Sequence, residues 1–564
     1  MEYGEKLAGL RKILAREKAD AFVLSTGDEF QGEYVADYAQ RLAWLTGFDG
    51  SAGSVAVTAD KAAFFTDGRY TIQAARQVPG GLYEIHNSAQ MAPEAWVEEK
   101  LGAKGGIAVD PWLVTQTQMR RWEAVAARKN AVVKRLAANP VDALWKDRPA
   151  APAGKAVAHG IAYAGKESTA KRKEIGAALV KAGADLVMLT DCASVAWLLN
   201  IRGEDVPYTP FVHAFAMLAS DGGAVLYTDP AKITPEVAAH LGRDVRVSPR
   251  SALEKDIKAC KGKGVMLDPD GAAAWFFDAF AGAKARIVEG QDPCALPKAC
   301  KNEVELEGMR NAHRRDGEAL TKFLRWIKAE APKGGLDEIS AAEKLEGFRK
   351  QSNLYRGGSF ATISGFGANG AVVHYRAVEA TNAKIEGDGL FLVDSGGQYP
   401  DGTTDVTRTI AIGSPSEEMK EAYTRVLKGH IAIARCKFPE GTTGSQLDAL
   451  ARYHLWQAGM DYDHGTGHGV GSYLSVHEGP QRISKMGNRV ALRPGMILSN
   501  EPGYYKAGEF GIRIENLVAV VRSAAKGFLE FETLTRAPLE ERLVLWEMMT
   551  YPEKKWWENY HVGL

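Results

Sequence analysis

Four acidic residues stand at the ends of apolar, strand-like segments in the C-terminal half of the sequence. Asp394 ends one segment in LVDSGGQYPDGTTDVTRT, and Asp405 follows 11 positions later in the next. Glu501 closes ILSNE, and Glu515 lies in the mostly apolar segment FGIRIENLVAVV. Buried carboxylates are rare without a partner, and two that face each other need a proton or a cation between them. The pattern therefore predicts a set of oxygen ligands for cations.

Three histidines occur in the glycine-rich stretch HGTGHGVGSYLSVHEGP. Each glycine costs a helix about 1 kcal/mol relative to alanine, so the stretch predicts a loop. Glycine also permits positive φ and close backbone approach, and we expect both to bring His468 to the acids. His464 and His477 are expected to flank the centre as hydrogen-bond donors rather than as ligands. His430 and His454 lie in helical patterns and are expected to be structural.

Together these side chains predict a centre for two metal ions. Four carboxylates balance the charge of two divalent cations, and oxygen ligands with one imidazole suit Mn²⁺, with Co²⁺ or Zn²⁺ as alternatives. Two such ions can share a water molecule, lower its pKa and polarise a scissile carbonyl, which is the chemistry of a hydrolase. Two plainer interpretations stay open at this point. Asp394 and Asp405 could be turn or surface residues, and Arg513 could be the ion-pair partner of Glu515.

The elements that must hold these residues follow from the hydrophobic pattern. A long helix is predicted after residue 302, and the strands and helices that follow it predict a mixed α/β domain with a largely antiparallel sheet. Ser445 is expected to cap the second of the later helices. The predicted strands are 360–364, 371–375, 389–396 and 403–412, and the predicted helices are 416–436 and 444–459.

The first half of the sequence contains a weak internal repeat. ADAFVL, LAWLTGFDG and AFFTDGR are echoed in the same order by ADLVML, VAWLLNIRG and AVLYTDP. Three echoes in order predict two similar α/β domains. The first boundary is expected in the Pro- and Ala-rich KDRPAAPAGKA and the second near DPCALPKACKNEVE. The predicted domains are residues 1–145, 146–300 and 301–564.

Composition narrows the classes of protein. The 564 residues hold 70 Lys and Arg against 70 Asp and Glu, so no overall charge favours nucleic acid or an anionic membrane. Five cysteines without CxxC pairs are expected to be reduced thiols. The N-terminus mixes both charge signs, unlike a signal peptide, and no apolar run of about 18 residues occurs. A soluble cytoplasmic protein with no membrane partner is expected.

With these motifs in hand, the sequence resembles the aminopeptidase P family, the Xaa-Pro aminopeptidases of the pita-bread metallopeptidases. The similarity is to the long, three-domain cytosolic branch and covers essentially the whole chain. EYVADYAQRLAWLTGFDGSAGSVAVT resembles the family's first domain, and KNEVELEGMRNAH, GAVVHYRAVEATN and DSGGQYPDGTTDVTRT resemble its catalytic domain. The resemblance implies two creatinase-like α/β domains followed by a pita-bread catalytic domain.

The resemblance also implies roles for single residues. Asp405 and Glu515 would bridge two metal ions, Asp394 would complete one site, and His468 and Glu501 would complete the other. Glu501 would also carry the proton from the attacking water to the leaving amine. The other implied roles are substrate orientation and stabilisation of the tetrahedral intermediate by His374 and His477, a place near the proline-binding pocket for His464, support of a ligand carboxylate by Arg513, and contact with the substrate or a domain-interface salt bridge for Arg69.

The implied activity is that of a manganese-dependent Xaa-Pro aminopeptidase. It would release the N-terminal residue from peptides with proline at the second position, with a hydroxide that bridges the two metal ions. The alternatives are a prolidase restricted to dipeptides and, in another class, a catalytically silent pita-bread module that binds proteins. A methionine aminopeptidase would not need the two upstream domains, and the five ligands argue against the creatinase-like amidinohydrolases, which use this fold without the metal set. The C-terminal tail, residues 553–564, is expected to help form a homodimer.

Overall fold

The computed structural model describes residues 1–564, which form two compact units. One unit contains Met1–Gly160 and Lys166–Cys294, and the other contains Ile161–Gly165 and Ala295–Leu564. The short helix α7 (Ile161–Ala164) belongs to the second unit, where the Asn302 side chain donates to the Ala164 carbonyl at 2.9 Å. The three domain ranges expected from the sequence stay a prediction.

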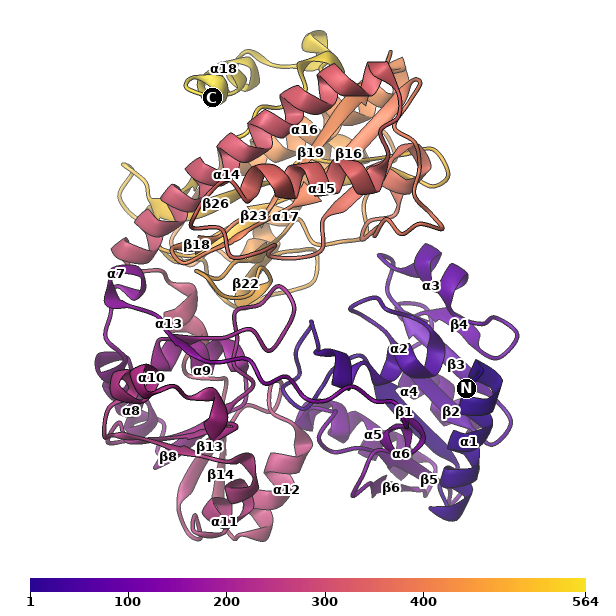
Figure 1. The fold of residues 1–564 in the computed structure, drawn as a ribbon, viewed down its shortest axis with the longest axis vertical. Helices are drawn as coiled ribbons and strands as arrows, with labels where there is room; N and C mark the ends of the chain where they lie inside the picture. Colours follow the sequence, from indigo (N-terminus) through magenta and orange to yellow (C-terminus); the bar gives the residue numbers. More distant parts are fainter. The chain divides into compact units, whose positions relative to one another are not determined.

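The first unit contains two six-stranded sheets of the same topology (Figure 1). Their strand orders are β4-β3-β2-β1-β5-β6 and β12-β11-β10-β8-β13-β14. In each sheet the first strand along the chain pairs antiparallel with one neighbour and parallel with the other. The two similar α/β folds predicted from the internal repeat are therefore confirmed.

The helices of this unit flank the two sheets. The N-terminal helix buries Leu7, Leu10 and Leu14, three or four residues apart, against the first sheet. The bounds are α1 Tyr3–Arg16, β1 Ala21–Ser25, α2 Arg41–Thr46, β2 Ser54–Thr58, β3 Ala62–Thr66, α3 Thr71–Gln77, β4 Glu84–Asn87, α4 Pro93–Lys100, β5 Gly106–Val109, α5 Gln116–Arg128, β6 Val132–Arg135, α6 Pro140–Leu144, β7 Val157–Ala158, α8 Ser168–Lys181, β8 Leu186–Leu189, α9 Cys192–Leu199, β9 Ile201–Arg202, β10 Phe215–Ala219, β11 Ala224–Tyr227, α10 Pro235–Leu241, β12 Val245–Ser248, α11 Leu253–Lys258, β13 Gly264–Leu267, α12 Ala274–Gly282 and β14 Arg286–Glu289.

The second unit is built on two antiparallel sheets, of order β15-β16-β19 and β20-β27-β26-β23-β21-β22, as the sequence predicted. Two short pairs, β17–β18 and β24–β25, complete it. The bounds are α13 Ala295–Ala299, α14 Glu303–Glu330, α15 Glu338–Arg349, β15 Ile363–Phe366, β16 Gly389–Ser395, β17 Gln398–Tyr399, β18 Gly402–Thr403, β19 Val406–Ile412, α16 Glu417–Ala434, β20 Lys437–Pro439, α17 Gly444–Trp456, β21 Gly467–Gly469, β22 Glu478–Ile483, β23 Ile497–Asn500, β24 Gly503–Lys506, β25 Phe510–Arg513, β26 Asn516–Arg522, β27 Phe528–Thr533 and α18 Tyr551–His561.

Helices cover both faces of these sheets. Phe391 and Val393 of β16 pack with α14 and α15, whereas Leu390 packs with α16. In the larger sheet, Leu517 contacts the cluster that contains the start of α14, and Val518 contacts the cluster of α16 and α17. Because side chains alternate along a strand, a sheet covered on both faces buries the side chains on both sides of each strand. Asp394, Asp405 and Glu515 are thereby buried at their strand ends, and Glu501 is half-buried.

Three expectations about local structure were wrong. Residues 371–375 do not form a strand, because the chain enters a 3-10 turn at Gly367–Ala371 and continues as a turn. The cap of α17 is Thr443 rather than Ser445, since the helix begins at Gly444 and Thr443 forms a capping box with Gln446. The predicted strand 403–412 is also interrupted, and β19 begins only at Val406.

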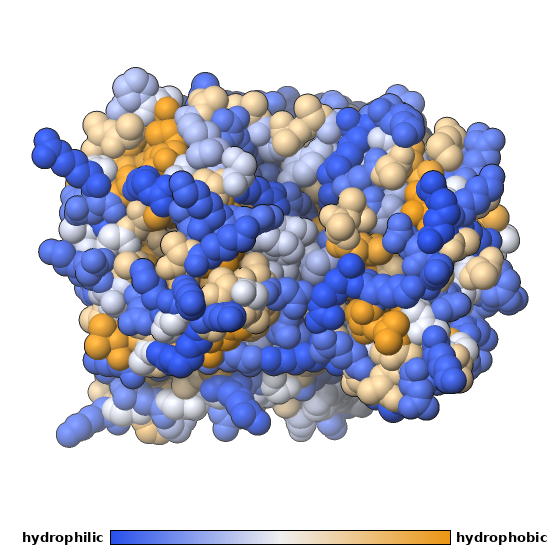
Figure 2. All heavy atoms as spheres, turned by 90° about the horizontal axis from the view of Figure 1, so that it is seen from below, coloured by the Kyte–Doolittle hydropathy of each residue, from blue (hydrophilic) through white to orange (hydrophobic).

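The C-terminal helix α18 packs on its own unit. Trp557 is buried against Trp546, with ring centroids 5.4 Å apart, and Trp556 stacks on Tyr560 at 5.0 Å. Within this one chain Trp557 is therefore buried and Trp556 is half-buried. No helix of the structure combines the length and the apolar character that crossing a bilayer requires. The face drawn in Figure 2 is covered largely by hydrophilic side chains, with apolar ones in scattered patches.

Candidate metal centre

The hairpin of β16 and β19 places Asp394 and Asp405 on one face. Asp394 lies opposite Thr407 in the strand register, and Asp405 precedes Thr407 by two residues. Diagonal neighbours of this kind share a face, as the sequence predicted, and both carboxylates are buried. The turn requires glycine at position 396, because a Cβ there would lie 1.9 Å from the Thr404 carbonyl oxygen.

Strand β21 carries His468 to these acids. A Cβ on Gly467 would lie 1.9 Å from the Ser499 carbonyl oxygen, and the His468 amide donates to Ser499 Oγ at 2.9 Å. The ring donates from Nδ1 to the Gly469 carbonyl at 2.9 Å, so Nε2 is the atom that faces the acids. The expected close approach of the backbone is confirmed. The expected positive φ is wrong, because none of the five glycines in this stretch adopts it.

Glu501 and Glu515 enter from the ends of two further strands. Glu501 follows β23, and its amide donates to the Thr466 carbonyl at 2.8 Å. Glu515 lies between β25 and β26, and its Oε2 accepts from Thr407 Oγ1 at 2.8 Å. The Glu515 carbonyl also accepts from buried Arg408 at 2.7 Å. Main-chain contacts therefore hold the backbone at both residues, and a side-chain hydroxyl holds the Glu515 carboxylate.

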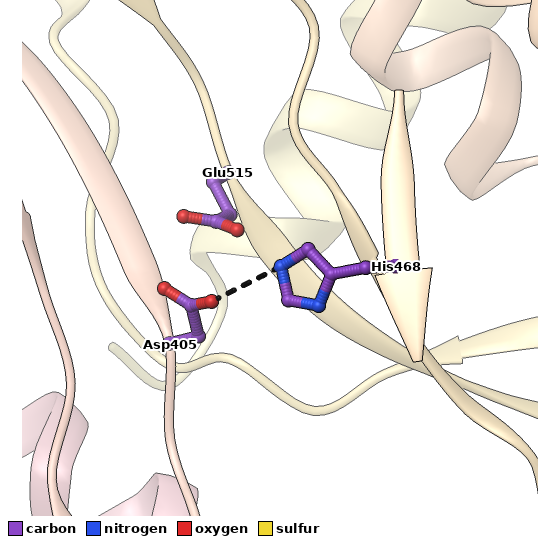
Figure 3. A group of neighbouring side chains, drawn as sticks. All are labelled: Asp405, His468 and Glu515. Carbon is purple, nitrogen blue, oxygen red and sulfur yellow. Dashed lines mark ion pairs between the residues drawn. The ribbon is translucent and has the colours of Figure 1, made fainter. Parts of the chain in front are cut away.

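The structure brings Asp405, His468 and Glu515 to one point (Figure 3). Ligand atoms of Asp405, His468 and Glu515 lie within 4.8 Å of one another. His468 Nε2 lies 3.4 Å from Asp405 Oδ2 and 3.6 Å from Glu501 Oε1. Asp394, Asp405 and Glu515 each keep one buried oxygen without a hydrogen-bond partner. An orphaned buried acceptor costs about 1–3 kcal/mol, so this donor set fits divalent cations.

The electrostatics of the centre agree with that fit. Burial raises the pKa of Asp394 to about 6, against the opposing charge of Arg513. Burial likewise raises the pKa of Glu501 to about 7, and it raises that of Glu515 well above its usual range, helped by the charge of Asp405. Burial opposes the charged form of His468, yet the neighbouring Asp405 and Glu501 raise its pKa to about 9. Without a cation, the cluster therefore binds protons at a higher pH than isolated carboxylates would.

Arg513 connects the centre to His464. Its Nη2 donates to Asp394 Oδ2 at 2.7 Å, and its Nη1 donates to the Tyr505 hydroxyl at 2.6 Å. That hydroxyl lies 2.8 Å from His464 Nε2, while His464 Nδ1 donates to the Gly465 carbonyl at 2.8 Å. The hydroxyl therefore donates to His464. Arg513 thus supports a carboxylate of the centre, but the pairing with Glu515 considered from the sequence is wrong.

The remaining predicted residues lie at different places. The His477 ring packs edge-on against His468, with centroids 4.2 Å apart. His374 is half-buried and follows Val373, whose carbonyl lies 3.5 Å from Arg513 Nη2. Arg69 belongs to the other compact unit, where it forms an ion pair with Asp67 at 2.7 Å. The roles predicted for these three residues stay predictions.

His430, which was expected to be structural, lies outside the set of predicted ligands. His430 is buried in α16, donates from Nδ1 to the Asn500 carbonyl at 3.0 Å and accepts from Asn516 Nδ2 at 3.1 Å. Burial lowers its pKa to about 3, so it is neutral. It contacts residues next to Glu501 and Glu515 and is structural.

Three residues that support the centre were not predicted from the sequence: Thr407, Arg408 and Tyr505. Thr407 could have been found, because its position two residues after Asp405 puts it on the same face of the strand. Arg408 and Tyr505 carry no such local signal. Arg408 donates to the Asn516 side chain and to the Tyr560 hydroxyl of α18, both far along the chain.

Comparison with known proteins then identifies the family. A protein named "Probable Xaa-Pro aminopeptidase P" from Neosartorya fischeri is 41% identical over 99% of this chain and 88% of its own. The chain belongs to the Xaa-Pro aminopeptidase P family. Its parts match the creatinase/prolidase N-terminal domain at residues 6–138 and 147–305, metallopeptidase family M24 at residues 307–522, and the C-terminal region of peptidase M24 at residues 527–563.

Solved structures agree with this membership. The X-prolyl aminopeptidase from Caenorhabditis elegans, a cytosolic enzyme with a di-nuclear active site, superposes with a TM-score of 0.94 at 34% identity. That match covers 100% of this chain and 95% of the other. The prolidase from Thermococcus sibiricus has a TM-score of 0.56 at 25% identity and covers 66% of this chain. The family member described here thus has two creatinase-like domains and a pita-bread metallopeptidase domain.

Proposed function

We propose that the protein is a metal-dependent Xaa-Pro aminopeptidase, which removes the N-terminal residue from peptides with proline at the second position. The observation that carries the proposal is the convergence of Asp405, His468 and Glu515 within 4.8 Å, with buried carboxylate oxygens that lack partners. Full-length similarity to proteins of that name supports the same activity.

Five residues would hold two divalent cations, with Mn²⁺ as the proposed metal. Cations in this position would activate a water molecule and polarise the carbonyl that precedes proline. The ligands are Asp394, Asp405, His468, Glu501 and Glu515. Arg513 would hold the Asp394 carboxylate in place through its 2.7 Å contact, which is how outer hydrogen bonds orient metal ligands.

The chain's own residues would manage the proton and the substrate. Glu501 Oε1 lies beside His468 Nε2 at the centre, where it can take a proton from the attacking water and pass it to the leaving amine. His477, packed against His468, and His374 would orient the substrate and stabilise the charge that develops on its carbonyl. Contact of Arg69 with the substrate is part of the same proposal.

Selectivity for proline is proposed to depend on His464. The bond before proline lacks an N–H, so ordinary hydrogen-bonding recognition is lost there and a pocket of matching shape must replace it. Both nitrogens of the His464 ring are hydrogen-bonded, which fixes its orientation. A His464→Ala variant is expected to lose preference for proline over alanine at the second position, and unchanged preference would count against this role.

The direct test compares three substrates on chelator-treated protein with and without added Mn²⁺. Release of Arg from Arg-Pro-Pro only after Mn²⁺ addition, with no cleavage of Met-Ala-Ser, is the expected result. Cleavage of Gly-Pro alone would indicate a prolidase. Absence of all three activities, with no metal retained, would indicate a protein-binding module. An Asp405→Asn variant should lose activity, whereas Glu509→Gln, which changes an exposed carboxylate, should not.

A homodimer and a cytoplasmic location are also proposed. The tail packs on its own unit, as described above, so the tail alone does not require a partner. Large exposed apolar side chains instead lie on α17, with Leu450, Tyr453 and Trp456 at 40%, 53% and 47% exposure. Light scattering of the purified protein would decide its oligomeric state. The related C. elegans enzyme is described as cytosolic, which supports the location.

A further inference from the structure

Glu338 is a buried acid outside the metal centre, and it was not predicted from the sequence. It is the first residue of α15, and no part of it is exposed to solvent. Asp337, which precedes it, caps the helix through the Ser340 amide at 2.9 Å. A carboxylate in the first turn is favoured by the partial positive charge of a helix N-terminus. Such burial still requires direct partners for both oxygens.

Those partners come from a single loop, residues 366–383. Oε1 accepts from the Phe366 amide at 2.7 Å and from Asn369 Nδ2 at 3.0 Å. Oε2 accepts from the Tyr375 hydroxyl at 2.7 Å and from the Ala383 amide at 2.9 Å. The carboxylate therefore connects the beginning, the middle and the end of the loop. A single hydrogen bond would hold the loop at only one point.

The main chain strengthens the same attachment. The Glu338 amide donates to the Ala383 carbonyl at 3.1 Å, and its carbonyl accepts from Ser364 Oγ at 2.7 Å. The next amide, that of Ile339, donates to Asn382 Oδ1 at 3.2 Å. The first turn of α15 thus holds both the strand that enters the loop and the segment that leaves it.

The middle of this loop reaches the metal centre. The Val373 carbonyl lies 3.5 Å from Arg513 Nη2, the atom that also contacts Asp394. The loop backbone lies directly against β25, because a Cβ on Gly511 would lie 1.7 Å from the Gly370 carbonyl oxygen. His374 stands between Val373 at the centre and Tyr375 at the Glu338 carboxylate. Its backbone is therefore held from both sides.

We propose that Glu338 is a positioning residue, which sets His374 at the metal centre by holding loop 366–383 to the start of α15. The inference rests on the proposed function for the role of His374. The hydrogen bonds of Glu338 go to the loop and to Ser364, and none of them goes to a predicted metal ligand. It acts through the loop, and its effect must therefore depend on His374.

The test is a double-mutant cycle in the full-length, Mn²⁺-loaded protein. Glutamine keeps the size of Glu338 but replaces one acceptor oxygen by a donor, which then faces amide and hydroxyl donors. Glu338→Gln is expected to lower kcat/KM for Arg-Pro-Pro about 10- to 100-fold with bound metal unchanged. In a His374→Ala background the same change should cost less than about 3-fold. The matched control is Glu343→Gln, an exposed acid on the same helix, which should have no effect.

A second variant and a second measurement cover a failure to fold. Tyr375→Phe removes one of the donors to the carboxylate, together with the contacts of the same hydroxyl with Asn369 and Thr381 inside the loop. It should give a smaller loss that also disappears without His374. Hydrogen exchange of residues 366–383 should accelerate in both variants, while exchange in β19 stays unchanged. Equal losses of kcat/KM with and without His374, or unchanged exchange, would overturn the inference. A wild-type protein that does not cleave Arg-Pro-Pro would instead overturn the proposed function, and hydrogen exchange would still test the anchoring by Glu338.

Discussion

Metal uptake by this centre should release protons, in an amount that depends on pH. The pKa values of Asp394, Glu501 and His468 are raised to about 6, about 7 and about 9, so all three hold protons at pH 6 to different degrees. A cation binds deprotonated ligands, so it must displace these protons. At pH 6 roughly half a proton leaves Asp394 and nearly one leaves each of the others, or about two to three in total.

Metal binding should release fewer protons as the pH rises. Near pH 8 the carboxyl groups of Asp394 and Glu501 have already ionised, whereas His468 still holds most of its proton, so release should fall to about one proton. Any proton held by Glu515, whose pKa is also raised, would add to both values. Because protons compete with the metal, affinity should decrease steeply as the pH falls through 7 and 6.

Titration calorimetry of chelator-treated protein with Mn²⁺ measures this number. Repeating the titration at pH 6 and pH 8, in pairs of buffers with different ionisation enthalpies, gives the protons released per protein. Asp394→Asn should lower the value at pH 6, and the exposed-site control Glu509→Gln should not. Release below about one proton at pH 6, or release that does not decrease by pH 8, would refute the reasoning.

Two further predictions concern stability. Gly396→Ala should lower the free energy of unfolding by about 3 kcal/mol or more and reduce bound metal, because its Cβ would meet the Thr404 carbonyl at 1.9 Å; wild-type metal content in the variant would contradict this. Burial, with the charge of Glu29, raises the pKa of Asp28 to about 7. The folded state therefore keeps a proton that the unfolded state loses. The free energy of unfolding should fall by up to about 4 kcal/mol as the pH rises from 4 to 7. Asp28→Asn can still accept from the amides of Phe30 and Gly32 and should remove that decrease in urea unfolding at pH 4 and pH 7. An equal decrease in the variant would contradict the assignment.

The parts of the fold that follow from local pattern were predictable from the sequence. The apolar run before Asp394 predicted β16, whose every residue is buried. The repeat of short motifs predicted two similar α/β domains, and the structure has two sheets of the same strand order. The acids stood out because a carboxylate at the end of a buried strand has an unusual environment. Their meeting point was inferred from charge and chemistry, and the distances among Asp405, His468 and Glu515 agree with it.

Long-range side-chain contacts were not predictable in the same way. Residues 371–375 have the composition of a strand, yet the Tyr375 hydroxyl lies at the Glu338 carboxylate, 37 positions earlier. Arg513 and Glu515 are two positions apart, yet Arg513 pairs with Asp394 across 119 positions. Glu338 itself resembles any acid in the first turn of a helix. Only burial distinguishes it, and burial of one glutamate is set by the whole domain.

The closest backbone approaches in the catalytic unit have a consequence for the gene. At Gly396, Gly467 and Gly511 a Cβ would lie within 2 Å of a carbonyl oxygen of another segment. Every non-silent single-base change in a glycine codon specifies either a residue with a Cβ or a stop. These three codons therefore have no conservative missense neighbour, and random mutagenesis with selection for activity should return them unchanged. Part of the information that builds the metal centre is thus encoded by positions that contribute no side chain at all.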